Sequence, residues 1–306
     1  MLDALGRRLR FAPPQPKPGF IKITERDTLV FEAINRHGPL PVHYLYEFTR
    51  SAGKNLVHLK RKISKLTHGT TTDAPYLYRP EQQWASIDGK FQPNIYDLTP
   101  RALAVLAERG IRLNNRTDPF LHRLMGACVN ASIHLAAEKK GYAYADLARL
   151  LAHEKCPEVT RRSPNPIAMP ARDKCVVPDA IFGVQKDRPC FYAFEIDRRT
   201  ESINSDTAKT AYGRKLIGYI DILENRTYRA QFGIPNFKIL TVTTNVLHLQ
   251  HMLNFYRSLN APGYAKHFLF KSVSNFGSNW RVPPVMHDLF DEPWTAADGS
   301  QLQIGE

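Results

Sequence analysis

The clearest hydrophobic pattern in the chain lies between residues 176 and 201. Two apolar runs, 180–184 and 190–196, flank a polar turn at 185–189 that contains Lys, Asp, Arg and Pro. Two β-prone runs around a turn of this length are typical of a β-hairpin. The pattern therefore predicts a pair of neighbouring strands just past the middle of the chain.

The predicted hairpin places acidic residues opposite each other. If Val184 pairs with Cys190 across the turn, antiparallel register keeps the sum of paired residue numbers constant, and Asp179 then faces Glu195. Asp197 lies two residues further along the same face of its strand. Three carboxylates are therefore expected to converge at the open end of the hairpin.

Such a convergence needs an opposing positive charge. Like charges directly opposite destabilise a sheet, and Mg²⁺ prefers carboxylate oxygens, so a divalent cation is a simple solution. The alternative is that Glu195 and Asp197 form the solvated face of an amphipathic strand, with Phe194 and Ile196 inside. The run 191–194 is apolar on both faces, which favours a strand covered on both sides with its carboxylates at the end.

The N-terminal third has the element order of a winged helix-turn-helix. Capping residues and apolar stripes predict helices over 24–37, 41–49 and 54–66, strands over 76–79 and 94–98, and a helix over 100–109. Three short helices, a two-stranded wing and a further helix are typical of this DNA-binding fold, whose third helix enters the major groove.

The predicted third helix is strongly basic. Its apolar residues fall on one face, and its other positions, with the residues just before it, supply the candidate DNA-binding side chains Lys54, Asn55, His58, Lys60, Arg61, Lys62 and Lys65. Asn55, His58, Arg61 and Lys62 are the ones we expect to reach bases or phosphates. The alternative is a small helical domain whose basic residues are only solvated.

The rest of the chain predicts an α/β sandwich with a mixed sheet. We expect helices over 118–139 and 144–153, a loop or irregular strand over 157–174, the hairpin, a helix over 206–223, a strand over 237–243, a helix over 246–259 and a strand over 267–273. The expected domains are a basic, Pro-rich arm (1–20), the winged helix (21–113), the sandwich (118–275) and an irregular tail (276–306).

One lysine of the helix after the hairpin has an unusual position. Lys215 lies between Tyr212 and Tyr219 on the helical stripe expected to face the sheet. A lysine in this position either extends its ammonium group to water or is held beside the hairpin carboxylates.

Charge points to a polyanionic partner. The net charge is +13, and residues 1–116 carry 19 Lys+Arg against 10 Asp+Glu. This excess favours nucleic acid, with duplex DNA as the leading partner. No apolar run is long enough to span a membrane and the N-terminus does not resemble a signal peptide, so we expect an intracellular protein with reduced cysteines.

Several motifs resemble a known family. Pro178-Asp179, followed after fifteen residues by Glu195-Ile196-Asp197, resembles the PD-(D/E)xK nuclease superfamily. The segments FEIDRRTES and RKLIGYIDIL, with TERDTLVFEAINRHGPLPVHYL and YDLTPRALAVLAERG near the N-terminus, are similar to the replication-relaxation family of plasmid and phage proteins. The resemblance covers roughly residues 22–275.

The resemblance implies a site and leaves part of it open. Asp179 and Glu195 would bind Mg²⁺ or Mn²⁺, which would lower the pKa of a bound water and stabilise charge on the scissile phosphate. The superfamily's third motif residue is normally a lysine, but Asp197 stands in that slot. Either Lys215 or, less favoured, Lys209 supplies the positive charge, or Asp197 joins a second metal site, or catalysis is lost. Glu138 and Glu154 are the options for an additional acid.

Three functions follow as hypotheses. The first is a metal-dependent DNA endonuclease or nickase whose catalytic group is Asp179, Glu195, Asp197 and Lys215, and whose metal ligands are the three acids. The second is a non-catalytic DNA-binding regulator or replication accessory with a nuclease-like scaffold. The third is an RNA-directed activity. The resemblance implies the cytoplasm of a bacterium, or of a phage-infected host, and leaves the oligomeric state open, a homodimer included.

Overall fold

The computed structural model describes residues 18–84, 92–114, 118–172, 174–198, 211–277 and 280–305. The chain forms two compact units, Met1–Ala131 with Arg281–Met286, and Ser132–Trp280 with His287–Glu306. Their division lies inside α5 (Phe120–Lys139), C-terminal to the expected boundary at 113–118. The reason is visible in an ion pair: Arg123, on the first part of α5, binds Asp97 at 2.5 Å and ties this part to the first unit.

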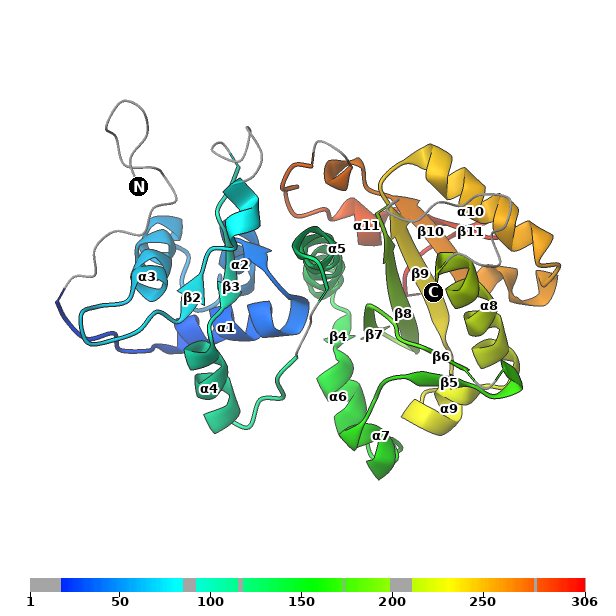
Figure 1. Ribbon diagram of the computed structural model, residues 1–306, viewed down its shortest axis with the longest axis horizontal. Helices are drawn as coiled ribbons and strands as arrows, with labels where there is room; N and C mark the ends of the chain where they lie inside the picture. The colour runs from blue at the N-terminus through cyan, green and yellow to red at the C-terminus, as the bar shows by residue number, and fades with distance from the viewer. Residues whose placement is uncertain are drawn as a thin grey trace. The chain divides into compact units, whose positions relative to one another are not determined.

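The first unit contains the expected helices and strands. They are α1 (Glu25–His37), α2 (Val42–Phe48), α3 (Leu56–His68), β2 (Leu77–Tyr78), β3 (Ile95–Leu98) and α4 (Pro100–Glu108). A two-residue strand that the sequence pattern did not predict, β1 (Leu40–Pro41), joins them in a sheet of order β1-β3-β2. A short 3-10 turn, Glu81–Trp84, follows β2 (Figure 1).

Local capping and apolar contacts explain these helices. Thr24 caps α1 in a reciprocal arrangement with Asp27, and the Asn55 side chain accepts a hydrogen bond from the His58 backbone at the start of α3. The helices bury one apolar stripe each, which forms the core of this unit: Val30, Phe31, Ile34, Leu45, Leu59, Ile63, Leu66, Ala102 and Leu106.

The second unit is built on a seven-stranded mixed sheet of order β12-β11-β10-β9-β8-β7-β4. Its strands are β4 (Ala143–Ala145), β7 (Ala180–Gln185), β8 (Pro189–Asp197), β9 (Lys238–Thr243), β10 (Phe268–Ser272), β11 (Trp294–Ala296) and β12 (Gln301–Leu302). The β8–β9 and β9–β10 pairs are parallel, whereas β4–β7, β7–β8, β10–β11 and β11–β12 are antiparallel. The expected α/β class and mixed sheet are confirmed.

The predicted hairpin register is confirmed. Val184 pairs with Cys190, and the ladder continues without a bulge to Ala180 opposite Phe194. The next step of this register brings Asp179 level with Glu195. The carboxylates therefore lie at the open end of the β7–β8 hairpin, as the apolar run between them indicated.

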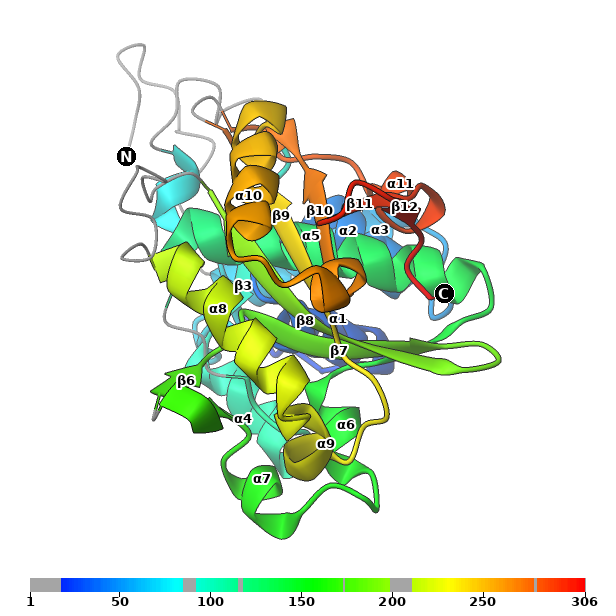
Figure 2. The same cartoon turned by 90° about the vertical axis from the view of Figure 1, so that its right-hand side faces the viewer.

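Helices cover both faces of the sheet (Figures 1 and 2). One face carries α6 (Leu147–Ala152), α8 (Ala211–Glu224), α9 (Thr227–Phe232) and α10 (Val246–Ser258). On the other face His134 of α5 stacks on Tyr144, which stacks on Phe182 of β7. No helix in the described part of the chain is both long and apolar enough to cross a membrane.

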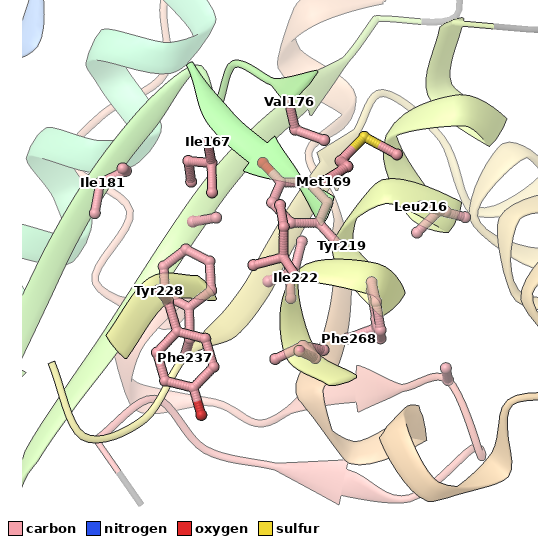
Figure 3. Close-up of a cluster of buried hydrophobic side chains, with 14 of the residues drawn as sticks. Ile167, Met169, Val176, Ile181, Leu216, Tyr219, Ile222, Tyr228, Phe237 and Phe268 are labelled. Carbon is pink, nitrogen blue, oxygen red and sulfur yellow. The ribbon is translucent and has the colours of Figure 1, made fainter. Parts of the chain in front are cut away.

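A small second hairpin holds α8 in place. Strands β5 (Ile167–Met169) and β6 (Lys174–Val176) pair with each other and pack on α8. Figure 3 shows Met169 and Val176 gathered around Leu216 and Tyr219. A Cβ atom on Gly218 would lie 2.5 Å from Val176 Cγ2, so the absence of a side chain there permits the close approach.

Three expectations for the second unit need correction. Residues 143–145 form an edge strand rather than the start of a helix, because Tyr144 fills the gap between His134 and Phe182. The segment 157–174, expected as a loop or irregular strand, contains the strand β5 but also the unexpected helix α7 (Glu158–Arg162). The tail after 276 is not irregular, since it contains α11 (Asp288–Asp291), β11 and β12 extend the sheet, and Trp294 is buried.

The chain turn after α3 depends on a glycine. Gly69 has φ +65°, and a Cβ there would lie 2.4 Å from the Asp73 carbonyl oxygen, whereas Gly110 after α4 has φ +71° with open space around it. Both replacements by alanine place a Cβ on a backbone with positive φ, at a cost of at least about 1 to 2 kcal/mol. The cost is higher at Gly69, because its ψ of −162° lies in a region that is essentially restricted to glycine. Gly69→Ala also creates a backbone clash, so we expect about 1 to 3 kcal/mol more destabilisation.

Urea unfolding of the two alanine variants measures the difference. Gly110→Ala serves as the control for a positive φ without a close contact. Equal unfolding free energies for Gly69→Ala and Gly110→Ala would contradict both the close contact and the glycine-restricted backbone at Gly69.

Candidate active site

The site begins with two carboxylates at the end of the β7–β8 hairpin. Asp179 precedes β7, and its Oδ2 accepts a hydrogen bond from the Ile196 backbone N–H at 2.7 Å. This bond continues the hairpin beyond its ladder and fixes the carboxylate beside β8. Glu195 lies on β8 and is only 2% exposed. The predicted pairing of these two acids is therefore formed, with Asp179 at the rim and Glu195 inside.

Helix α8 supplies the positive charge. Lys215 Nζ lies 2.6 Å from Glu195 Oε2 and 3.7 Å from Asp179 Oδ1. The Lys215 side chain is 33% exposed, so the lysine lies at the edge of the site while its Nζ contacts both acids. Of the two orientations that the sequence left open, the structure has the one in which the lysine is held at the carboxylates.

A tyrosine one turn further along α8 completes the contacts of Glu195. The Tyr219 hydroxyl donates a hydrogen bond to Glu195 Oε1, so the two carboxylate oxygens have different partners, a cation and a phenol. Residues four apart on a helix lie on one face, which is how a single helix provides both groups. Tyr219 is fully buried under the β5–β6 hairpin (Figure 3).

The surroundings of Glu195 favour its protonated form. Burial raises the pKa of Glu195, and the negative charge of Asp179 raises it further, while Lys215 and Tyr219 act in the opposite direction; the result is a pKa of about 8. Burial and the Glu195 charge likewise raise the pKa of the Tyr219 hydroxyl, which therefore remains a hydrogen-bond donor. A strongly shifted acid beside a rim carboxylate and a lysine is the kind of arrangement found at functional sites.

The third predicted carboxylate has a different partner. Asp197 Oδ2 lies 3.1 Å from His248 Nε2, and both side chains are buried. Within the described residues, no three His, Cys, Asp or Glu side chains are arranged to hold a metal ion. The expected convergence of three carboxylates is thus corrected in its geometry: Asp179 and Glu195 lie together, whereas Asp197 contacts a histidine of α10.

The remaining candidates do not join the pair. Lys209 lies outside the described residues. Glu138 pairs with His134 at 3.1 Å, and the ring stack from His134 to Phe182 lies on the opposite face of the sheet from Glu195. Glu154 is exposed after α6, beside the turn end of the hairpin.

Two contacts of the site were not predicted. Tyr219 was recognised only as part of an apolar stripe, although its spacing of four from Lys215 is the signal that would have placed it at Glu195. His248 has no such signal, because it is 51 residues from Asp197 and meets it only through the packing of α10 on the sheet.

The candidate DNA-binding side chains on and just before α3 differ in whether they have contacts within the first unit. Lys54, His58, Lys60, Arg61 and Lys65 are exposed. Two other candidates have internal roles: Asn55 caps the helix, and Lys62 lies 3.1 Å from Asp27 and donates to the Lys22 carbonyl at 2.7 Å. Asn55 is itself exposed, although its side-chain oxygen is engaged in the cap, and Lys62 is partly buried, so DNA contact stays a prediction for both.

A cavity adjoins this exposed face. It has a volume of about 480 Å³ and lies between α3 and the β2–β3 wing. Lys60, His68 and Arg79 line it together with hydroxyl groups of Ser64 and Thr67. Basic and hydroxyl side chains of this kind are the usual donors to phosphate oxygens.

The family comparison covers both units. The family model described as Replication-relaxation matches residues 31–236, about two thirds of the chain. The chain belongs to the replication-relaxation family. Curated proteins and solved structures gave no match.

Membership of the replication-relaxation family indicates a role in plasmid replication or relaxation and an interaction with DNA. The matched segment includes α3 and the Asp179, Glu195, Lys215 and Tyr219 contacts, and it ends before His248. The sequence resemblance to this family is thereby confirmed.

The shifted pKa of Glu195 makes the stability of this replication-relaxation protein depend on pH. Without metal, folded Glu195 keeps its proton to about pH 8, whereas the ordinary value is 4.5. The folded state therefore binds the extra proton between these values, and the free energy of unfolding falls as the pH rises through this window. We expect Glu195→Gln to reduce the slope of unfolding free energy against pH, measured by urea unfolding with a chelator present.

Glu158→Gln is the matched control, because Glu158 is exposed and its ion pairs within the described part of the chain are with the exposed Arg161 and Arg162 of its own helix. It should leave the slope unchanged. An unchanged slope in Glu195→Gln as well would show that Glu195 does not titrate in this window.

Proposed function

We propose that this protein is a metal-dependent DNA endonuclease or nickase acting in plasmid or phage replication. The observation that carries the proposal is the position of Lys215 Nζ between the carboxylates of Asp179 and Glu195. Two acids and a lysine at the end of a β-hairpin provide the charges that phosphodiester hydrolysis requires. Because the lysine comes from α8, the aspartate in the usual lysine slot does not remove this charge from the site.

The carboxylate pair fits a divalent cation in its chemistry. Asp179 and Glu195 would hold Mg²⁺ or Mn²⁺, with water completing the coordination, since these hard cations prefer oxygen ligands. Burial and then the negative charge of Asp179 raise the pKa of Glu195, and a bound cation would favour the ionised carboxylate. When bound, the metal supplies positive charge to the scissile phosphate and acidifies a water molecule.

The protein side chains have separable roles in this proposal. Lys215, partly exposed, faces the phosphate and stabilises the charge that develops on it. Tyr219 orients the Glu195 carboxylate through its buried hydrogen bond. His248 holds Asp197, which keeps the end of β8 attached to α10.

The first unit would bind the duplex. The exposed residues Lys54, His58, Lys60, Arg61 and Lys65 lie on or just before α3, the third helix of a winged-helix arrangement, and such a helix enters the major groove. Their charges match the phosphate backbone, whose neutralisation gives DNA binding a strong salt dependence.

A non-catalytic DNA-binding regulator is the second candidate. It is favoured by Asp197 in the slot that normally holds a lysine, and by the capture of this acid by His248. The two candidates share the DNA-binding unit and differ in whether the carboxylate pair and Lys215 cleave DNA.

Nicking of supercoiled plasmid in Mg²⁺ or Mn²⁺ tests the catalytic proposal. We expect relaxed or linear product from the wild-type protein and none from the double variant Asp179→Ala, Glu195→Ala. Lys215→Met should lower the rate at least about 100-fold, because it removes a positive charge aimed at the transition state.

Lys139→Met, at the exposed end of α5, is the matched lysine control and should nick normally. Absence of product from the wild-type protein in both metals, or equal cutting by the double carboxylate variant, would exclude the nuclease and leave the regulator.

The salt dependence of duplex binding tests the role of α3. Replacing Lys60, Arg61 and Lys65 by alanine should lower the slope of log affinity against log salt by about 0.9 for each phosphate that the variant no longer neutralises. A control variant with the same charge change replaces the exposed residues Lys139, Arg188 and Arg257 of the second unit. Equal slopes for the two triple variants would contradict the assignment of α3 as the DNA-binding surface.

A further inference from the structure

A separate cavity of the second unit lies at the other end of the hairpin. It has a volume of about 560 Å³ and is lined by residues of α6, of the turn end of β7–β8 and of the segment from α9 to Pro235. Helices α6 and α9 are in the lower part of Figure 2. Five residues of β-strand separate Val184, which lines it, from Asp179, which corresponds to roughly 17 Å. The cavity is therefore distinct from the carboxylate pair.

The walls of this cavity combine apolar surface with positive charge. Phe191, Leu150 and Ile234 supply apolar wall, and four basic residues also line it: Arg149, His153, Lys155 and Arg229. Among the described residues that line the cavity there is no Asp or Glu. The charge is thus of one sign, which is complementary to an anion.

The basic residues remain accessible to a ligand. Arg149, His153, Lys155 and Arg229 are all exposed. Arg149 Nη1 donates to the Tyr144 carbonyl at 3.4 Å and Arg229 Nη2 donates to the Pro235 carbonyl at 3.2 Å. Each of these contacts uses one guanidinium nitrogen and orients the group, so further N–H donors are left for phosphate oxygens.

An aromatic ring forms part of the floor. Phe191 lies across the hairpin from Gly183, and a Cβ on Gly183 would be 2.7 Å from the Phe191 ring. The ring therefore covers the Gly183 backbone, while Phe191 also lines the cavity and is half-buried. An aromatic surface beside a cluster of basic groups is suited to stacking a base and binding its phosphates.

We propose that this cavity is a binding site for a free nucleotide, with the base against Phe191 and the phosphates at Arg149, Lys155 and Arg229. The volume lies within the range of small-molecule sites, and the combination of apolar wall and convergent cations matches the two halves of a nucleotide. This site goes beyond the proposed nuclease and does not depend on it.

Titration calorimetry of the full chain with ATP, in a chelator so that the carboxylate pair binds no metal–nucleotide complex, tests the site. We expect saturable binding, and at least about 10-fold weaker binding of inorganic tripolyphosphate, because the base contributes stacking. The double variant Arg149→Glu, Lys155→Glu should lose ATP binding, whereas the control Lys139→Glu, Arg257→Glu should retain it.

A second variant tests the ring without opening the strand pair. Phe191→Leu keeps an apolar cover over Gly183 and should weaken ATP binding at least about 5-fold while leaving tripolyphosphate binding unchanged. Asp179→Ala should bind ATP like the wild type, because Asp179 does not line the cavity. ATP binding therefore tests the cavity independently of the nuclease proposal.

Three results would overturn the proposal. They are no ATP binding at millimolar concentration, equal affinity in the two charge-reversed variants, and equal affinity for ATP and tripolyphosphate. A 5′-phosphorylated trinucleotide that binds the cavity while ATP does not would assign it to a nucleic-acid strand end and would likewise exclude a free nucleotide.

Discussion

The interaction on which the site depends is the contact of one ammonium group with two carboxylates that the β7–β8 hairpin forces together. Glu195 is buried beside Asp179. Its pKa rises because burial removes the water that would stabilise its charge and because the Asp179 carboxylate is close. Lys215 offsets this repulsion only if α8 stays against the sheet. The β5–β6 hairpin, packed on the Gly218 side of α8, keeps it there, so an element without catalytic groups determines the geometry of the site.

The two units differ in how their charged residues are placed. The first unit carries a dense positive surface on α3, while its buried acid Asp27 neutralises one lysine of that helix and links the charge pattern to folding. The second unit carries acids whose charges are compensated inside the sheet. The replication-relaxation family match spans both the unit with the basic helix and the unit with the internal ion cluster.

Local sequence patterns were sufficient to predict those contacts that strand register or helical period determines. The pairing of Val184 with Cys190 followed from the turn length, and it fixed the position of Asp179 relative to Glu195. The helices of the first unit followed from their capping residues and apolar stripes. The sheet-facing position of Lys215 followed from its spacing on α8, although the sequence could not decide between water and the carboxylates. Contacts between distant segments could not be predicted from the sequence: His248 binds Asp197 only because α10 packs on the sheet. Strands β4, β11 and β12 were missed because they are too short to show an alternating pattern of apolar and polar residues.

Manganese binding tests the central claim, that Asp179 and Glu195 form a metal site beside Lys215. Titration of the metal-free protein with Mn²⁺, followed by electron paramagnetic resonance of the free ion, measures the number of ions bound. We expect one ion per chain, with binding abolished in the Asp179→Ala, Glu195→Ala variant and retained in Lys139→Met. Equal Mn²⁺ binding by the double carboxylate variant and the wild-type protein would contradict the claim.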